Sequence, residues 1–211
     1  MPFNIADFKA QIEDGGVLQT NRYDVAVFFS SSEGSPGLIG TSISTAGAQT
    51  TMGSMTKDLT YRCIAASLPG IAIMSSDNNR LGMGLKEKMP FTGAFTDVSL
   101  TFLCDKAGAA YKFWYSWINF IFSANGKEAG SSVVNGRQYY TTQYKDSYSS
   151  NIEITMYDTE GEASFMCKLY KAFPISMNEV SLGWGDNNNL VKLSIQITFR
   201  EWAMDDVSLT T

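Results

Sequence analysis

The chain has 211 residues, of which 44% are hydrophobic and 13% aromatic, so it can bury a substantial core as one domain. Its 16 basic and 21 acidic residues give a net charge of -5, which is opposite in sign to the basic surface of a protein that grips nucleic acid. The absence of histidine excludes serine–histidine and cysteine–histidine catalytic sites and zinc sites of the HExxH type.

Carboxylate pairs are the remaining candidates for acid–base chemistry. Asp205 precedes Asp206, and Glu160 stands two positions before Glu162. Neither pair has neighbours that promise the desolvation needed to shift a carboxyl pKa, so we interpret both as solvated turn or terminal charges. We expect no catalytic residues and no enzymatic activity.

Metal and cofactor sites are not indicated either. Cys63, Cys104 and Cys167 are odd in number, far apart and without CxxC spacing, which predicts reduced, buried thiols rather than a disulfide framework or a zinc site. The Asp- and Asn-rich runs at residues 77–79 and 186–189 lack the ligand spacing of a calcium loop and predict turns. We therefore expect no metal and no cofactor.

In chain order, the first predicted element is a short amphipathic helix over residues 5–13, with Asn4 as its N-cap. A strand is predicted over residues 23–29. Residues 31–60 are rich in Ser, Thr and Gly and poor in apolar residues, which is typical of a flexible insertion rather than a separate domain. We expect one domain over residues 1–211 that carries this insertion.

The next predicted strand covers residues 62–67 and ends at residues 68–70, where a proline cannot donate to a ladder and a glycine permits a bend. Residues 77–90 begin with turn-forming side chains and carry two glycines among several charges, which predicts a projecting hairpin or loop. A further strand over residues 98–104 is followed by Asp105, a candidate helix cap.

Residues 107–124 are mostly apolar and have two interpretations. Their length approaches that of a membrane span, but Lys112, Ser116 and Asn119 interrupt them and the aromatics run through the middle, which favours a buried helix. A stripe at helical spacing and a second apolar flank make the helix apolar on two sides, so it is expected to contact two partners, one its own sheet and the other a neighbouring subunit. The stripe comprises Tyr111, Trp114, Tyr115, Ile118, Ile121 and Phe122, and the flank comprises Phe113, Trp117 and Phe120.

The clearest pattern lies over residues 191–199, where every odd position is apolar and every even position polar. This period of two predicts a strand with one dry and one wet face, about 30 Å long. Before it we expect a loop over residues 125–150 and two strands, over 152–157 and 165–172, that are joined by a turn at 159–161. We expect the second of these strands to end at Pro174, and the first strand of a final hairpin to cover residues 176–182. Together the elements predict a mainly β fold, an antiparallel β-sandwich or barrel with one packed α-helix.

Six pieces of sequence follow one another between Leu68 and Trp202. They are LPG at 68–70, MPFTGAFTDVSLTF at 89–102, FWYSW at 113–117, YKDSYSSNIEITMYD at 144–158, KLYKAFPISMNEVSLGW at 168–184 and ITFREW at 197–202. In this order they resemble the tail tube protein family of contractile-tailed bacteriophages, which includes baseplate proteins that initiate the tube. The insertion at 31–60 is longer than expected for a plain tube subunit and keeps the alternative of a baseplate tube initiator or adaptor open.

The resemblance implies a β-sandwich with a packed helix, six copies of which join their sheets into a ring. The homohexameric rings would stack into a tube inside a contractile sheath, and the lumen would conduct the genome during ejection. Expected partners are identical subunits, sheath and baseplate proteins, and DNA in transient, non-specific passage, with no membrane insertion by the isolated chain. The expected location is the virion tail, after assembly in the host cytoplasm.

Elementary physics agrees with this picture. Closing the sheets of several subunits into one barrel removes exposed strand edges, and an acidic subunit suits a lumen that must not hold phosphate. The resemblance also implies that the polar stripe of some strands faces the lumen, the alternative being the outer solvent face. The candidates for the lumen are Asp24, Glu153, Lys192, Gln196 and Thr198. The projecting segment resembles the place where family members reach an adjacent subunit or ring, and its candidates are Arg80, Lys86, Glu87 and Lys88.

A carbohydrate-binding or carbohydrate-degrading β-domain is the alternative from another class. Four tryptophans could stack on sugar rings, although their positions favour the core. They are Trp114, Trp117, Trp184 and Trp202.

Overall fold

The structure is a computed structural model. It describes residues 5, 9, 18–28, 59–79, 82, 84–122, 133–134, 137–138, 142, 144–185 and 189–206. Of the predicted N-terminal helix only Ile5 and Lys9 lie among these residues, and both are helical. The predicted insertion lies outside them apart from Leu59 and Thr60, and Leu59 is buried in the core.

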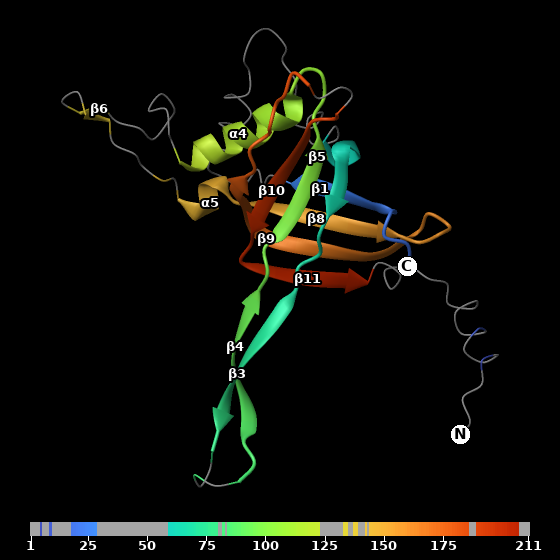
Figure 1. The fold of residues 1–211 in the computed structure, drawn as a ribbon, viewed down its shortest axis with the longest axis vertical. Coiled ribbons are helices and arrows are strands. Elements are labelled where there is room, and N and C mark those ends of the chain that lie inside the picture. The colour runs from blue at the N-terminus through green and yellow to red at the C-terminus, as the bar shows by residue number, and fades with distance from the viewer. Residues whose placement is uncertain are drawn as a thin grey trace.

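The described elements make a mainly β, antiparallel fold with one long helix, as the sequence predicts (Figure 1). They are β1 (Tyr23–Phe28), β2 (Cys63–Ala66), β3 (Ile71–Asn78), β4 (Glu87–Phe95), β5 (Val98–Leu103), α4 (Ala109–Ile121), β6 (Val133–Val134), β7 (Arg137–Gln138), α5 (Lys145–Tyr148), β8 (Ser150–Tyr157), β9 (Ala163–Met177), β10 (Lys192–Thr198) and β11 (Glu201–Asp206). Six strands follow the order β1-β8-β9-β10-β5-β2, and β11, the seventh, pairs with β9 off this path. The two ends of this path, β1 and β2, do not pair with each other, so one subunit forms no closed barrel.

Strand β9 belongs to two sheets. Its first part pairs with β8 and β11, and we call these strands together with β1 sheet A. Its last part pairs with β10, which continues through β5 to β2, and we call this group sheet B. The change occurs at Lys171, whose φ of 49° lies in the left-handed region and turns the strand. Figure 1 shows β5 and β10 running steeply across β8, β9 and β11, so the two sheets form a strongly crossed sandwich.

The sequence prediction that Pro174 ends this strand is wrong. Strand β9 continues to Met177, and Pro174 pairs with Ile197 while Ser176 pairs with Gln196. Ile175 therefore has no partner in the register, which is a β-bulge. Proline is tolerated at such a bulge because no hydrogen bond of the ladder requires its missing N–H there.

The core lies between the two sheets and under helix α4. The apolar side chains of β10 alternate into it as predicted, since Leu193, Ile195 and Ile197 are fully buried. The same cluster takes alternate side chains from β1, β5, β8 and β9, and partly buried side chains of β2 and β11 pack against it. It includes Val25, Val27, Val98, Leu100, Phe102, Ile152, Ile154, Cys167 and Leu169. The period of two over residues 191–199 is thereby confirmed as a strand with one dry face.

Helix α4 buries its predicted flank more completely than its predicted stripe. Trp114 is buried, but Tyr111 and Tyr115 of the predicted stripe are exposed, whereas Phe113 and Trp117 of the predicted flank are buried. Burying the flank removes large rings from water without trapping the tyrosine hydroxyls, which need hydrogen-bond partners in a core. The Trp117 indole donates from Nε1 to the Tyr148 carbonyl at 2.9 Å. Among the described residues, none of the helices combines the length and apolar character needed to cross a bilayer.

Asp105 caps this helix from four residues upstream. Its Oδ1 accepts a hydrogen bond of 2.6 Å from the N–H of Ala109, and Arg62 lies 3.9 Å away on the other side. Burial acts to raise the pKa of the Asp105 carboxyl, but the Ala109 hydrogen bond and the Arg62 charge outweigh it and lower that pKa. The capping role predicted for Asp105 is confirmed, although Gly108 occupies the N-cap position itself.

Two strand predictions near the C-terminus are wrong. Residues 178–182 of the predicted strand 176–182 are not in a strand, and β11 follows β10 where no strand was expected. Strand β11 pairs with the first part of β9, Trp202 lying opposite Leu169. The alternation of a single segment contains no information about such long-range pairing.

Replacing a core side chain of β10 should destabilise the subunit strongly. We expect Ile195→Ala to lower the free energy of unfolding by about 2–5 kcal/mol, because it leaves a cavity in a fully buried site. Its neighbour Gln196 is exposed, so Gln196→Ala should change stability by less than about 0.5 kcal/mol. Urea denaturation of both variants measures this, and equal effects would contradict the assigned faces of β10.

Removing the Asp105 cap should have a pH-dependent effect. Asp105→Ala should cost about 1 kcal/mol at pH 7. Because the folded-state pKa is lowered from 3.8, this stability is present above the unfolded pKa and is lost as the pH falls through the folded pKa. Urea denaturation from pH 7 to about pH 3 should therefore show a shrinking difference from the wild type. Glu160→Ala, at an exposed turn, is the control, and a difference that stays constant with pH would contradict the capping role.

Candidate assembly interface

The most prominent surface feature is the hairpin of β3 and β4, which projects from the sandwich (Figure 1). The two strands pair only with each other, from Ile71 opposite Phe95 to Asn78 opposite Glu87. The predicted projection at residues 77–90 is therefore confirmed, and it is longer than the sequence indicated. An isolated two-stranded hairpin is at best marginally stable in water, so this one needs support from elsewhere.

The base of the hairpin is held where Gly70 meets Thr96. The Thr96 N–H donates to the Gly70 carbonyl at 3.1 Å, and the Gly70 N–H donates to Thr96 Oγ1 at 2.7 Å. A Cβ at Gly70 would lie 2.9 Å from that hydroxyl, so the close approach requires glycine. The Phe95 ring also contacts Phe199 of the sandwich, with 5.9 Å between the ring centroids. These contacts fix the base but leave the rest of the hairpin in solvent.

The hairpin exposes apolar side chains along both strands. Ile73 is 69% exposed and Phe91 is 65% exposed. Ile71, Met74, Met89 and Phe95 are also exposed. A contiguous group of large exposed apolar side chains is characteristic of a protein–protein contact. The charged residues of this segment were predicted as contacts and these apolar residues were not, although the sequences IAIM at 71–74 and FTGAF at 91–95 contain them.

The predicted charged contacts lie at the tip of the hairpin. Lys86 forms an ion pair of 3.7 Å with Asp77 across the turn, and both side chains are largely exposed. Glu87 and Lys88 are also exposed and available to a partner. Arg80 lies outside the described residues. Because exposed ion pairs contribute only about 0.2–1 kcal/mol, the apolar residues of the hairpin carry more of the potential binding energy.

The sandwich has unpaired strand edges in the part of the chain that the structure describes. In sheet A these are β1 and β11, and in sheet B they are β2 and the last part of β9. Each edge presents backbone N–H and C=O groups that can pair with another strand. Two different open edges on one sheet are what a head-to-tail ring requires, since each contact joins one edge to the other.

The outer face of sheet A is charged. Asp24 accepts a hydrogen bond of 3.0 Å from the Tyr157 hydroxyl, which together with burial raises the pKa of Tyr157. Glu153 lies opposite Lys168 in the register, and Lys168 forms an ion pair of 3.0 Å with Asp205. This hydrogen-bonded pair raises the pKa of Lys168. The first two predicted lumen residues, Asp24 and Glu153, therefore belong to one mixed-charge surface.

The outer face of sheet B is polar and almost uncharged. Lys192 is the only charged residue of β5 and β10, and it stands at one end of β10. In β5 and β10 the rest of this face carries Ser99, Thr101, Leu103, Ser194, Gln196 and Thr198. Hydrogen bonds join several of these side chains, with 3.4 Å between the hydroxyls of Ser99 and Ser194 and 3.0 Å from Ser176 Oγ to Gln196 Oε1.

The five predicted lumen residues thus divide into two groups. Asp24 and Glu153 lie on the outer face of sheet A, whereas Lys192, Gln196 and Thr198 lie on the outer face of sheet B. The dry faces of the two sheets share one core, so their outer faces point in opposite directions. One bore can be lined by only one of these two groups.

The side chains capable of chemistry are dispersed. Burial raises the pKa of Cys63 and of Cys167 to about 11, so both thiols stay protonated near neutral pH, and all three cysteines are free. Among the described residues no group of three or more Cys, Asp or Glu side chains is placed to hold a metal ion. Glu160 and Glu162 are exposed in the turn between β8 and β9.

The four tryptophans do not form a sugar-stacking surface. Trp114 and Trp117 are fully buried, and Trp202 is half-buried against the core. The expectation of a core position is wrong for Trp184, which is 106% exposed. Of the four tryptophans, only Trp184 therefore has a fully exposed indole ring.

The sequence of the whole sandwich matches a known family. The family model described as phage tail tube protein matches residues 18–205. The chain belongs to the phage tail tube protein family. Membership of this family makes it a structural component of a tail and not an enzyme, and the resemblance identified from the six sequence pieces is confirmed. No curated protein sequence matches the chain.

Solved structures share the fold at low sequence identity. A chain of an extracellular contractile injection system, the PVC sheath–tube complex in the extended state, has a TM-score of 0.55 at 16% identity, covering 94% of this tail tube protein and 97% of that chain. A chain of the anti-feeding prophage baseplate has a TM-score of 0.55 at 11% identity, with coverages of 92% and 98%. A chain of the anti-feeding prophage tube-terminating cap has a TM-score of 0.53 at 15% identity, with coverages of 90% and 92%. The fold of the tail tube protein is therefore shared by components at different levels of such assemblies.

Proposed function

We propose that this tail tube protein forms hexameric rings that stack into a tube, and that the lumen of the tube conducts the phage genome during ejection. The observation that carries the proposal is the exposed apolar hairpin of β3 and β4 on a subunit of this family. Exposure of Ile73 and Phe91 to water does not stabilise an isolated subunit. A neighbouring subunit that covers them would supply the support that the isolated hairpin lacks.

Ring closure in this proposal uses the open edges of sheet B. Strand β2 of one subunit pairs with the last part of β9 in the next, which makes one continuous barrel and removes both edges from solvent. The β3–β4 hairpin lies between β2 and β5 in the chain, so it leaves the body directly beside this contact. Its apolar side chains are therefore positioned to pack on the adjacent subunit.

The outer face of sheet B lines the bore in this arrangement. Lys192, Gln196 and Thr198 then face the lumen, and Asp24 and Glu153 face outward. A neutral, hydroxyl-rich surface suits a conduit, because lysines and arginines along the wall would displace counterions and bind each passing phosphate. The hydrogen bonds between neighbouring side chains also satisfy part of their polarity within the wall.

The proposed partners follow from this position. Identical subunits occupy the strand edges and the hairpin, and the mixed-charge face of sheet A is available to the sheath. Baseplate proteins contact the terminal ring, and DNA passes without sequence recognition. Assembly takes place in the host cytoplasm before the tube becomes part of the virion tail.

A second candidate is a baseplate protein that initiates the tube. The fold favours it as much as the first, since the anti-feeding prophage baseplate chain and the PVC sheath–tube chain have equal TM-scores. An initiator forms one ring and does not extend by itself, with residues 31–60 contacting another baseplate protein. Electron microscopy of the purified protein separates the two candidates by showing tubes or single rings.

Hairpin substitutions test the assembly function. We expect Ile73→Ser with Phe91→Ser to abolish rings and tubes in electron micrographs, because two exposed apolar contacts with the neighbour are lost. The monomer should keep its thermal midpoint, since neither side chain belongs to the core. Asn78→Ser on the same hairpin should assemble as the wild type does. Normal tubes from the double variant would contradict the role of the hairpin.

Cysteine labelling tests which face lines the bore. Gln196→Cys and Glu153→Cys should both react in the dispersed protein with a maleimide attached to a large polymer. In assembled tubes the cysteine at 153 should still react, and the cysteine at 196 should be protected because the polymer cannot enter the lumen. The native Cys63 and Cys167 react slowly, since burial raises the pKa of each to about 11. The reverse pattern would assign the bore to sheet A.

A further inference from the structure

Strand β9 contains a β-bulge where it passes from sheet A to sheet B. At this point Asn151 of β8 stands opposite two residues of β9, Tyr170 and Lys171, because the register shifts by one. Leu169 and Ala172 on either side of the bulge are both fully buried, so the extra residue keeps both parts of the strand facing the core. The bulge therefore lets one strand belong to two sheets that cross.

Neighbouring side chains hold the bulge in a conformation that lysine rarely adopts. The φ of Lys171 is 49°, which is the only positive φ of a non-glycine residue in the described part of the chain. Its backbone N–H donates to Asn151 Oδ1 at 3.3 Å, and its ammonium donates to Asp146 Oδ1 at 2.6 Å. Such a conformation persists only where the surrounding contacts fix it, so these two bonds matter for the direction of the strand.

Helix α5, which carries Asp146, also contacts β9 beyond the bulge. The Tyr148 ring packs edge-on against Phe173 with 5.2 Å between the centroids, and the Lys145 ammonium lies 5.4 Å from the centroid of the Phe173 ring. The Tyr148 carbonyl accepts the hydrogen bond from the Trp117 indole, and α5 lies beside α4 (Figure 1). We call Lys145, Asp146 and Tyr148 together the α5 clamp, because they join the bulge in β9 to helix α4.

Helix α5 also ends the pairing of β8 with β9. The ladder between these strands stops at Ser150, because the chain directly before it is helical and not extended. From Phe173 to Met177 strand β9 pairs only with β10 in the part of the chain that the structure describes. The open edge that closes the ring in the proposed function therefore begins beside the α5 clamp.

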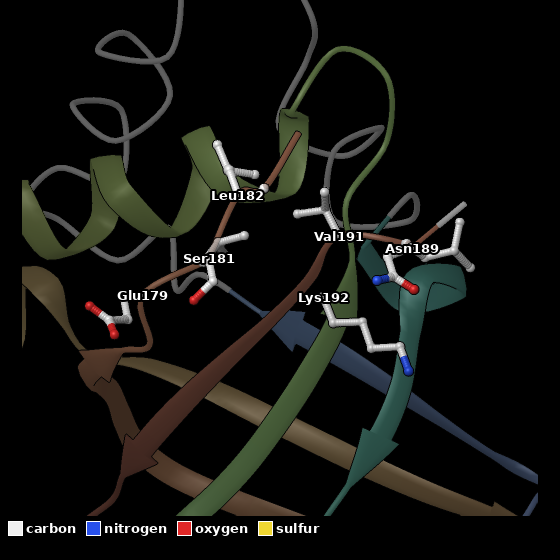
Figure 2. Close-up of a pocket in the computed structure, with 9 residues that line it drawn as sticks. Glu179, Ser181, Leu182, Asn189, Val191 and Lys192 are labelled. Carbon is white, nitrogen blue, oxygen red and sulfur yellow. The ribbon is translucent and has the colours of Figure 1, made fainter. Parts of the chain in front are cut away.

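The other end of this open edge is also bounded. After Met177 the chain leaves the sheet, with Asn178 N–H donating to the Ser194 carbonyl at 3.0 Å, and enters the loop between β9 and β10. Figure 2 shows this loop from Glu179 to Lys192, and its two arms line a cavity of about 320 Å³. The open edge is thus a short segment between α5 and this loop. Strand β2 has 4 residues and is short enough to pair with it.

We propose that the α5 clamp positions this edge for the contact between subunits and so fixes how many subunits close one ring. This inference rests on the proposed function, in which β2 of the next subunit pairs with the edge. Lys171 sets the direction of the edge relative to sheet A, and the side chains on Phe173 mark where the incoming strand stops. An edge rotated about the bulge would hold the next subunit at another angle, and a ring closes only when one angle repeats around the circle.

The ion pair between Lys171 and Asp146 is the part of the clamp that can be changed without disturbing the core. Their side chains are 42% and 82% exposed, so the pair contributes little to the stability of the subunit. A small rotation of the edge is nevertheless enough to change a ring, because the same error is repeated at every contact around the circle. Ring size should therefore respond to this pair more strongly than stability does.

Exchanging the two charges tests the clamp. Asp146→Lys and Lys171→Asp each place like charges against each other, and the double variant restores an ion pair of opposite polarity. Aspartate also adopts the left-handed conformation more readily than lysine, so the backbone at residue 171 can keep its conformation. We expect each single variant to form at least tenfold fewer rings of the wild-type size in electron micrographs, with open arcs and rings of other sizes in their place. The double variant should return most rings to the wild-type size.

Two measurements on the dispersed protein accompany the micrographs. The thermal midpoints of all three variants should stay within about 4 °C of the wild type, since the ion pair is exposed. Amide hydrogen exchange in peptides that span residues 170–177 should be at least threefold faster in the single variants and close to the wild-type rate in the double variant. Glu160→Lys makes the same change of charge as Asp146→Lys at an exposed turn, and it should alter neither hydrogen exchange nor ring size.

The outcomes separate this inference from the proposed function. Rings of the single wild-type size from both single variants would overturn the role of the clamp and leave the tube function in place, as would a double variant that behaves like the single ones. A changed ring size in Glu160→Lys would overturn that role as well, because any added charge would then affect closure. A wild-type protein that forms neither rings nor tubes would overturn the tube function together with the role of the clamp in ring closure.

Discussion

The structure depends on one strand that is shared by two sheets. Strand β9 pairs with β8 and β11 up to the turn at Lys171 and then with β10, so both sheets are parts of one continuous ladder. Their dry faces must then meet, and the side chains between them, such as Ile154 and Ile195, are fully buried or nearly so. The direction of each outer face follows from this arrangement, because a sandwich with one core has two outer surfaces that point apart.

This geometry separates the tasks of a tube subunit. The charged face with Asp24 and Glu153 and the neutral face with Gln196 and Thr198 are formed by different sheets, so each can meet a different environment. The connections at the ends of sheet B form two separate surfaces, since the β3–β4 hairpin leaves from one end and the β9–β10 loop from the other (Figure 1). Family membership, strand edges and exposed apolar residues are thus consistent with a single mode of assembly.

Structure was predictable from the sequence where the pattern is local. The alternation over residues 191–199 predicts β10 because a period of two requires only neighbouring residues, and Asp105 was recognisable from its place before an apolar helix. Structure that depends on pairing between distant segments could not be predicted in this way. Strand β11 forms because β9 offers an edge, and Pro174 is tolerated because no ladder bond at the bulge requires the N–H that proline lacks. Trp184 is exposed to solvent because its loop leaves the sheet. The division of the five lumen candidates between two outer faces was not predictable from the sequence either, because it depends on how the two sheets pack against each other.

The turn at Lys171 also has a mechanical consequence. Sheets that only pack against each other separate when their side chains slide, which needs no more than the loss of van der Waals contact and burial. Here the peptide backbone runs unbroken from one layer into the other, so a load that pulls the layers apart is borne by covalent bonds at the corner. A tube wall built from such subunits would resist separation of the two sheets within each subunit, which suits a tail that is placed under a sudden mechanical load.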